Sequence, residues 1–221
     1  MHVRQITPNL IQLTRLRLVN AFLVREDDGF TLVDTTVARS GDALIEAAQR
    51  AGAPIRRIAL THGHGDHVGS LDELRGRLDG HVQVAMPELD ARIHAGENVV
   101  DDKLPGSWPE LETKPDVLLE PGDCVGSLEV IETPGHTPGH VAFLDTRDRT
   151  LIAGDVLTTL GGVAVSSHFT LPFPSRSLRW RPGTRRSTSI RPAGCGPSSR
   201  SCLQRATGPR SAIRARRLCA R

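Results

Sequence analysis

The chain has 221 residues, with 28 lysines and arginines against 25 aspartates and glutamates, so its formal net charge is +3. This length allows one domain with a sizeable core, or one domain followed by a tail. Because the sequence contains no apolar run of about 18 residues, it predicts no membrane-spanning helix. Residues 1–8 lack an apolar signal segment, so we expect a cytoplasmic protein.

The charge is distributed unevenly along the chain. Residues 175–221 contain 13 of the arginines and no lysine, aspartate or glutamate, so their net charge is +13. Residues 1–174 therefore carry every acidic residue, and their net charge is −10. We predict one folded domain over residues 1–174 and a poorly ordered tail, rich in Arg, Ser, Pro and Cys, over residues 175–221.

The first part of the chain predicts an antiparallel meander, then a helix and a further strand. The strands are predicted over Leu10–Leu18, Asn20–Val24 and Phe30–Asp34, the helix over Asp42–Ala51 and the last strand over Arg57–Leu60. The strand assignments rest on apolar runs and turn signals, such as the hairpin turn at Asp27–Gly29. The helix assignment rests on apolar residues at helical spacing.

A run of potential metal ligands, Thr61-His-Gly-His-Gly-Asp-His67, follows the predicted strand Arg57–Leu60. Three imidazoles and one carboxylate fall within six residues, and imidazole nitrogens and carboxylate oxygens are standard zinc ligands. The two glycines allow a tight turn, so that ligands from both of its sides converge. The alternative is an exposed histidine-rich loop or tag, but tags lie at chain ends and do not follow a buried strand.

Shorter elements are predicted after the histidine run. Helices are expected over Asp66–Leu78 and Pro87–His94, and strands over His81–Ala85, Asp116–Glu120, Ser127–Thr133, His140–Asp145 and Thr150–Ala153. Residues 96–115 show no period and predict a loop that shapes a pocket, with Trp108 either as a pocket wall or in ordinary packing. This order of strands and helices suits two sheets packed between helices.

Two later motifs lie at the edges of predicted strands. They are Thr133-Pro-Gly-His-Thr-Pro-Gly-His140 and Ala153-Gly-Asp155. The HxHxDH run, the GHTxGH motif and the strand-terminal AGD motif, in this order, resemble the metallo-β-lactamase superfamily over about residues 1–174. The chain looks most like its glyoxalase II and lactonase members. The resemblance implies an α/β fold, the four-layer αββα sandwich.

The resemblance also implies a centre of two zinc ions. The implied ligands are His62, His64 and His136 for the first ion, Asp66 and His67 for the second, and Asp155 as the bridge. The implied supporting residues are Asp34, His140, Thr133 and Thr137. In the family the ligand is the first histidine of GHTxGH, so His140 is expected to support the site. A turn-capping role is the alternative for Asp34.

The implied activity is zinc-dependent hydrolysis of a small-molecule ester, thioester or lactone by a metal-bound hydroxide. Asp66 is the expected catalytic residue, passing a proton to the leaving group. The resemblance and the missing signal segment favour these substrates over β-lactams. His2, His81, His94 and His168 stand outside every motif, and we expect surface or capping roles for them. The sequence carries no signal of oligomeric state.

The chain departs from the family pattern near its end. The family has one more histidine, usually in a GHG context about fifty residues after the bridging aspartate, but the last histidine here is His168. The composition of residues 175–221 is typical of a GC-rich gene translated in the wrong frame. Shifting the frame over Gln204–Arg210 permits Ala-Gly-His-Gly-Pro-Ala, so we predict a frameshift near residues 174–178.

Two alternatives remain open at this stage. If the tail is genuine, the chain is a catalytically impaired, metal-binding relative that lacks its last ligand. A basic tail also suggests a nuclease of the same superfamily. We expect no nucleic-acid partner, because the tail lacks the interleaved aromatic residues on which bases stack.

Overall fold

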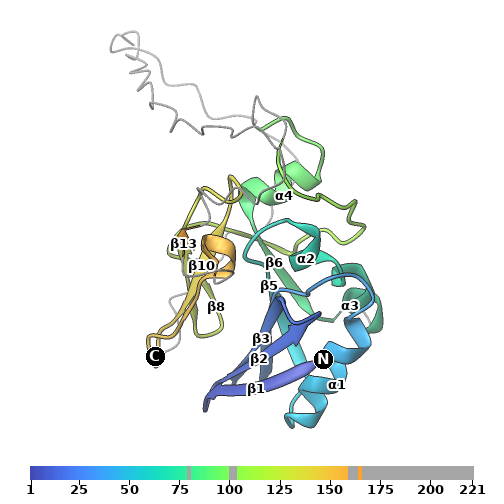
Figure 1. The fold of residues 1–221 in the computed structure, drawn as a ribbon, viewed down its shortest axis with the longest axis vertical. Helices are drawn as coiled ribbons and strands as arrows, with labels where there is room; N and C mark the ends of the chain where they lie inside the picture. The colour runs from blue at the N-terminus through green and yellow to red at the C-terminus, as the bar shows by residue number, and fades with distance from the viewer. Residues whose placement is uncertain (79–80, 100–103, 159–163, 166–221) are drawn as a thin grey trace, which may run out of the picture. The chain divides into compact units, whose positions relative to one another are not determined.

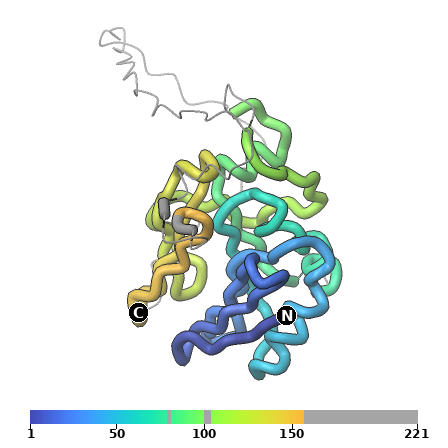
Figure 2. The backbone as a smooth tube through the Cα atoms, in the orientation of Figure 1, coloured from blue at the N-terminus to red at the C-terminus, as the bar shows by residue number. Residues whose placement is uncertain are grey.

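The structure, a computed structural model, describes residues 1–78, 81–99, 104–158 and 164–165. Consecutive strands come first, strands separated by helices follow, and a second run of strands comes after them (Figures 1 and 2). Two sheets contain most of the strands, and a separate antiparallel pair joins β12 (Leu157–Thr158) to β13 (Ala164–Val165). The predicted tail, residues 175–221, lies outside the described residues.

Seven strands form the first sheet, in the order β1-β2-β3-β4-β5-β6-β7. They span His2–Thr7, Leu10–Arg15, Val19–Glu26, Gly29–Val33, Ile55–Ala59, Gln83–Pro87 and Val117–Leu119. Strands β1 to β4 are antiparallel, whereas β4 to β7 are parallel. Because β4 and β5 run in the same direction, the segments that follow them leave the sheet at the same edge.

Helices pack on one face of the first sheet. They are α1 (Gly41–Arg50), α2 (Gly65–Val68), α3 (Leu71–Arg77) and α4 (Glu88–His94). Their buried residues, such as Leu44 and Leu74, join Phe30, Leu32 and Ile58 of the sheet in one apolar cluster. Burial of this area from water is the main source of stability for the helical layer.

The opposite face of the first sheet packs against a second, antiparallel sheet. This sheet has the order β11-β10-β9-β8, with β8 at Cys124–Val125, β9 at Leu128–Glu132, β10 at Val141–Asp145 and β11 at Leu151–Ile152. Val33 and Ala59 of the first sheet and Leu128 and Phe143 of the second lie in one buried cluster. One helical layer and two sheets, three of the four predicted layers, therefore lie among the described residues.

Most predicted elements agree with the structure within a few residues, but β1, β8, β12 and β13 were not predicted. The predicted strand Leu10–Leu18 ends earlier, at Arg15, because Leu16 and Arg17 adopt positive φ angles of 50° and 65° and form the turn into β3. These two residues continue the apolar and polar alternation of the strand, so the turn carries no sequence signal.

The predicted helix Asp66–Leu78 is wrong as a single element, because α2 and α3 are separate. Gly69 lies against the backbone of the segment after β4, and a Cβ there would meet Ala38 N at 2.5 Å. The Ser70 hydroxyl donates to Val37 O and accepts from Ser40 N, both over 2.8 Å. These contacts interrupt the helix where it passes that segment.

In the part of the chain that the structure describes, no helix has the length and the apolar character needed to cross a membrane.

We expect Phe143→Ala to lower the free energy of unfolding by about 3–5 kcal/mol, because a fully buried ring between the sheets would be replaced by a cavity. Chemical denaturation of the full chain measures this change. Leu151→Ala is the control, because Leu151 is on the same sheet but 53% exposed. The control should change stability by less than about 0.5 kcal/mol. Equal effects of the two substitutions would contradict the assignment of this core.

Candidate metal centre

Three loops converge beyond the ends of the two sheets. The histidine segment, Thr61–His67, leaves β5 and enters α2. The His136 turn, Thr133–His140, joins β9 to β10, and Asp155 lies in the 3-10 helix after β11. Val141 N donates to Thr61 O over 2.9 Å, which joins the histidine segment to the first residue of β10, directly after the His136 turn.

The potential ligands gather in two groups among the described residues. One contains His62, His64 and His136, and the other contains His62, His67 and Asp155, with the ligand atoms of each group within 4.8 Å of one another. His64 Nδ1 lies 3.0 Å from His136 Nε2. The two carboxylate oxygens of Asp155 lie 3.3 Å from His67 Nε2 and 3.4 Å from His136 Nε2. The groups therefore share His62, and Asp155 faces a member of each.

In His62, His64 and His67, one ring nitrogen lies against a neighbouring oxygen. His62 Nδ1 lies 2.9 Å from Thr61 Oγ1, and His64 Nε2 donates to Pro105 O over 3.1 Å. His67 Nδ1 donates to Asp34 Oδ2 over 2.8 Å. Contacts of this kind fix the rings and leave the opposite nitrogen for a metal.

His62 Nε2 is the strongest sign of a metal at this place. This nitrogen is buried and has no hydrogen-bond partner among the described residues. A buried polar atom without a partner is unfavourable unless another group binds it. A divalent ion between the imidazoles would satisfy it, so the donor set fits a metal.

Asp34 holds the histidine segment in place through hydrogen bonds. Its backbone is in the left-handed region, with a φ angle of 62°, and its side chain is buried. The carboxylate accepts from Thr61 N over 2.8 Å, and from the Thr61 hydroxyl and His67 Nδ1. The structure therefore places Asp34 in contact with a predicted ligand.

The other predicted supporting residues make different contacts. His140 is buried, and its Nε2 accepts from Asp155 N over 3.1 Å, so this nitrogen faces a donor. Its Nδ1 lies 2.8 Å from the Thr133 hydroxyl. The Thr137 hydroxyl donates to Asp90 and not to a predicted ligand. His140 is thus placed to hold the Asp155 loop.

Gly154 packs closely against His140, whereas Asp66 lies at the rim of the cluster. Gly154 has a φ angle of 54°, and a Cβ there would come within 2.8 Å of His140 Nε2, which explains the glycine of the AGD motif. Asp66 lies at the rim, with its carboxylate 3.9 Å from His67 Nε2 and its side chain 48% exposed. The structure therefore does not bring Asp66 into either group.

Burial and neighbouring charges separate the pKa values within the cluster. Burial lowers the pKa values of His62, His64 and His136, and neighbouring histidines lower them further. Burial also opposes a charge on His67, but the carboxylates of Asp34 and Asp155 outweigh it and hold the His67 pKa well above its usual value.

The pKa values of Asp155 and His140, which contact each other, are both lowered, but for different reasons. Burial alone would raise the pKa of Asp155, yet the hydrogen bond and charge of His67 lower it to about 2. Burial lowers the pKa of His140 to about 3. At neutral pH, Asp155 is therefore ionised and His140 is neutral.

Residues 14–189 match the family model for the metallo-beta-lactamase superfamily. The chain belongs to this superfamily. A relative from Bacillus subtilis (strain 168), the protein YobT, is 43% identical over 162 residues, which cover 71% of this chain and 69% of YobT. The probable metallo-hydrolase YybB from the same strain is 31% identical over 165 residues, covering 72% of this chain and 74% of YybB.

Other relatives show how far the likeness extends. The hydroxyacylglutathione hydrolase of Rhodopseudomonas palustris (strain HaA2) is 35% identical over 122 residues, which cover 53% of this chain but only 40% of that enzyme. Among solved structures, TTHA1623 in a di-iron-bound form shares 29% identity at a TM-score of 0.54, covering 72% of this chain and 80% of TTHA1623. A β-lactamase from Chitinophaga pinensis shares 30% identity at the same TM-score, covering 64% and 56%.

The comparisons confirm the predicted superfamily and the metallo-β-lactamase fold, and the chain is a metal-dependent hydrolase. Members of this superfamily bind divalent metals, and the TTHA1623 structure holds two iron ions. The chain spans less than two thirds of the Rhodopseudomonas enzyme and of the Chitinophaga β-lactamase.

Sequence reasoning missed Asp90 and misjudged His94. Both residues are on α4, outside every motif, and His94 was expected on the surface or at a cap. The Asp90 carboxylate is buried and accepts from Gly63 N over 2.8 Å. His94 Nε2 donates to Gly63 O over 2.8 Å, and its ring lies 5.3 Å from that of Trp108, centroid to centroid. No local pattern marks these contacts, because each partner is about thirty residues away.

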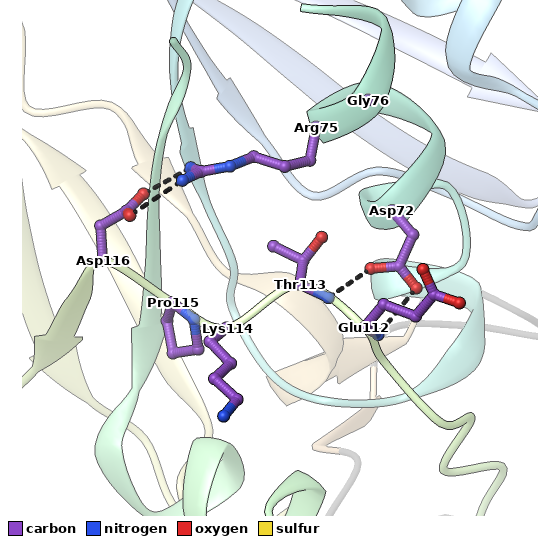
Figure 3. Close-up of a pocket in the computed structure, with 8 residues that line it drawn as sticks. All are labelled: Asp72, Arg75, Gly76, Glu112, Thr113, Lys114, Pro115 and Asp116. Carbon is purple, nitrogen blue, oxygen red and sulfur yellow. Dashed lines mark hydrogen bonds and ion pairs between the residues drawn. The ribbon is translucent and has the colours of Figure 1, made fainter. Parts of the chain in front are cut away.

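A surface hollow of about 550 Å³ lies beside α3, away from the family's motif residues (Figure 3). Arg75 makes two hydrogen bonds to the Asp116 carboxylate, and the Asp72 carboxylate accepts from the backbone N–H groups of Glu112 and Thr113. None of the predicted metal ligands lines this hollow. These pairs anchor residues 112–116 to the helix.

Metal binding should release protons unequally at the two groups. The carboxylates of Asp34 and Asp155 favour the protonated form of His67, and burial favours the neutral form of His64. An ion bound at the His67 group should therefore displace more protons than an ion bound at the His64 group. Isothermal titration of the metal-free chain near pH 7 in buffers of different ionisation enthalpy measures this release. His67→Ala is the control and should abolish the proton-releasing phase. Equal proton release in both phases would contradict these electrostatics.

Proposed function

We propose that the chain is a zinc-dependent hydrolase that cleaves the carbonyl group of an ester, thioester or lactone. The observation that carries the proposal is the pair of ligand groups that share His62, with Asp155 facing a member of each. This arrangement suits two ions in close proximity. Family membership supports the same reading.

In this proposal, His62, His64 and His136 hold the first ion. His67 and Asp66 hold the second, and Asp155 bridges the two. The positions of the ring nitrogens support the histidine assignments, because the nitrogens turned away from the cluster contact Thr61, Pro105 and Asp34. Asp66 would bind the second ion from the rim of the cluster, where its carboxylate lies 3.9 Å from His67 Nε2.

When bound, such a pair of ions lowers the pKa of water and polarises a carbonyl oxygen. The residues of this chain position the reactants and move the protons. Asp66 is half-exposed beside His67, so its carboxylate can take a proton from water and pass it to the leaving group. Asp34 holds the ring of His67 in place during this transfer.

The surroundings of the cluster support an organic acyl substrate. The Trp108 ring lies 5.1 Å from that of His64, centroid to centroid, and forms an aromatic wall. The β2–β3 turn lies at the same edge of the first sheet as the ends of β4 and β5, and its Leu16 and Leu18 are about two-thirds exposed. The likeness to hydroxyacylglutathione hydrolase favours a thioester.

The test uses the full chain loaded with zinc and four substrates: a hydroxyacylglutathione thioester, a γ-lactone, a nitrophenyl ester and a cephalosporin. We expect turnover of at least one of the first three and little hydrolysis of the cephalosporin. His62→Ala should abolish turnover, because both groups lose a ligand. Failure of all three acyl substrates, or preference for the cephalosporin, would contradict the proposal.

Asp66→Asn should lower kcat by about 10²–10⁴-fold, with a smaller change in KM, because the proton carrier is lost. Steady-state kinetics with the best substrate of the panel measures both constants. Asp27→Asn is the matched control, since Asp27 is exposed in the β3–β4 turn at the opposite end of the first sheet. Equal kinetics of wild type and Asp66→Asn would refute the catalytic role.

A second candidate is a catalytically impaired metal-binding relative. The observation that favours it is the second group, which contains His67, Asp155 and the shared His62 but no additional histidine among the described residues. We also propose that residues 175–221 result from a shifted reading frame, since they contain 13 arginines and no acidic residue.

Measuring the zinc content of the chain and resequencing its gene distinguish the two candidate functions. If the printed sequence is the native one, the dialysed chain should retain about one zinc ion and show little hydrolysis. A single-base correction that restores a GHG-containing ending should instead give about two ions and full activity. Two firmly held ions in the chain as printed would refute the impaired candidate.

A further inference from the structure

Helix α4 holds both backbone polar groups of Gly63, the residue between two predicted ligands. Asp90 and His94 are four residues apart on this helix and therefore share one of its faces. Asp90 Oδ2 accepts from Gly63 N, and His94 Nε2 donates to Gly63 O, both over 2.8 Å. One face of a short helix thus fixes the peptide groups on either side of Gly63.

The same carboxylate also reaches the His136 turn. Asp90 Oδ2 accepts from the Thr137 hydroxyl and Oδ1 accepts from Gly139 N, each over 2.8 Å. The side chain of Asp90 is buried, so these hydrogen bonds are shielded from water. Asp90 therefore ties the loop that carries His62 and His64 to the loop that carries His136.

His94 reaches a third loop, the Trp108 loop (residues 104–109). His94 Nδ1 lies 3.1 Å from Pro109 O, so both ring nitrogens face carbonyl oxygens. A Cβ on Gly63 would come within 2.5 Å of the Trp108 ring and 2.7 Å of His94 Nε2. The glycine is therefore required for this close packing, independently of any turn.

We propose that Asp90 and His94 are a positioning pair that sets the spacing of His62, His64 and His136. Neither residue touches the ion or the substrate. They act on metal affinity and on ligand geometry by fixing the loops that carry the three histidines. This inference rests on the proposed metal centre and adds to it two residues outside the family motifs.

The test compares Asp90→Asn, His94→Leu and His94→Gln in the full chain, titrated with Co²⁺ in competition with a chromophoric chelator. The asparagine amide would face at least one N–H or O–H donor of the loops, so Asp90→Asn keeps the volume but loses an acceptor. Leucine removes the donor to Gly63 O, whereas glutamine retains an N–H donor near that position. Arg92→Ala is the control, since Arg92 forms an exposed ion pair on the same helix.

We expect Asp90→Asn and His94→Leu to weaken the tighter Co²⁺ site by about 10–100-fold and to change its visible absorption spectrum. His94→Gln should restore affinity and spectrum toward wild type, and Arg92→Ala should leave both unchanged. Circular dichroism establishes that each variant is folded during titration. If Asp90→Asn fails to fold, the comparison of His94→Leu with His94→Gln carries the test alone.

Two results would overturn the inference, and they are distinguishable. Folded variants with wild-type Co²⁺ affinity and spectrum, even with lower melting temperatures, would show a merely structural role and leave the proposed function intact. A wild-type chain that binds no Co²⁺ at this site would overturn both the positioning role and the proposed function.

Discussion

The backbone of the histidine segment must find hydrogen-bond partners after it leaves the sheet, and the rest of the site depends on how it does so. Buried N–H and C=O groups without partners are costly. Thr61 N donates to Asp34, and Thr61 O accepts from Val141. Gly63 N donates to Asp90, and Gly63 O accepts from His94. These partners come from three separate parts of the chain, the segment after β4, helix α4 and strand β10, so satisfying this short segment draws those parts together.

The same contacts fix the histidine segment in a conformation that can bind a metal. Two buried carboxylates hold it from separate places, Asp34 directly after β4 and Asp90 on α4. With its backbone fixed, His62 keeps a buried ring nitrogen that nothing else in the described structure satisfies. In a site of this kind, hydrogen bonds within the protein fix the positions of the ligand residues and leave their ligand atoms free. Metal binding requires this arrangement.

The sequence predicted the fold and the main cluster well, because both depend on local patterns. His62, His64 and His67 are close in sequence, and their spacing carries the metal-ligand signal in one short run. His136 and Asp155 lie in recognisable motifs at strand ends. The structure gathers His62, His64 and His136 in one group and His62, His67 and Asp155 in another, and it leaves the predicted ligand Asp66 outside both.

The features that the sequence did not reveal depend on contacts between distant segments. The break between α2 and α3 arises where Gly69 meets the backbone near Ala38, although the apolar spacing continues through it. Asp90 is an ordinary acidic residue on a short helix, and only the folded chain shows it buried among donors from two loops. The same holds for His94, whose partner Gly63 lies on another element.

Anomalous X-ray diffraction at the zinc edge, from crystals of the full chain grown with zinc, tests the central claim most directly. The account predicts an anomalous peak bound by His62, His64 and His136, with Asp90 and His94 adjacent to it but not bound to the ion. A strong peak at another place, with these three histidines unbound, would contradict the account.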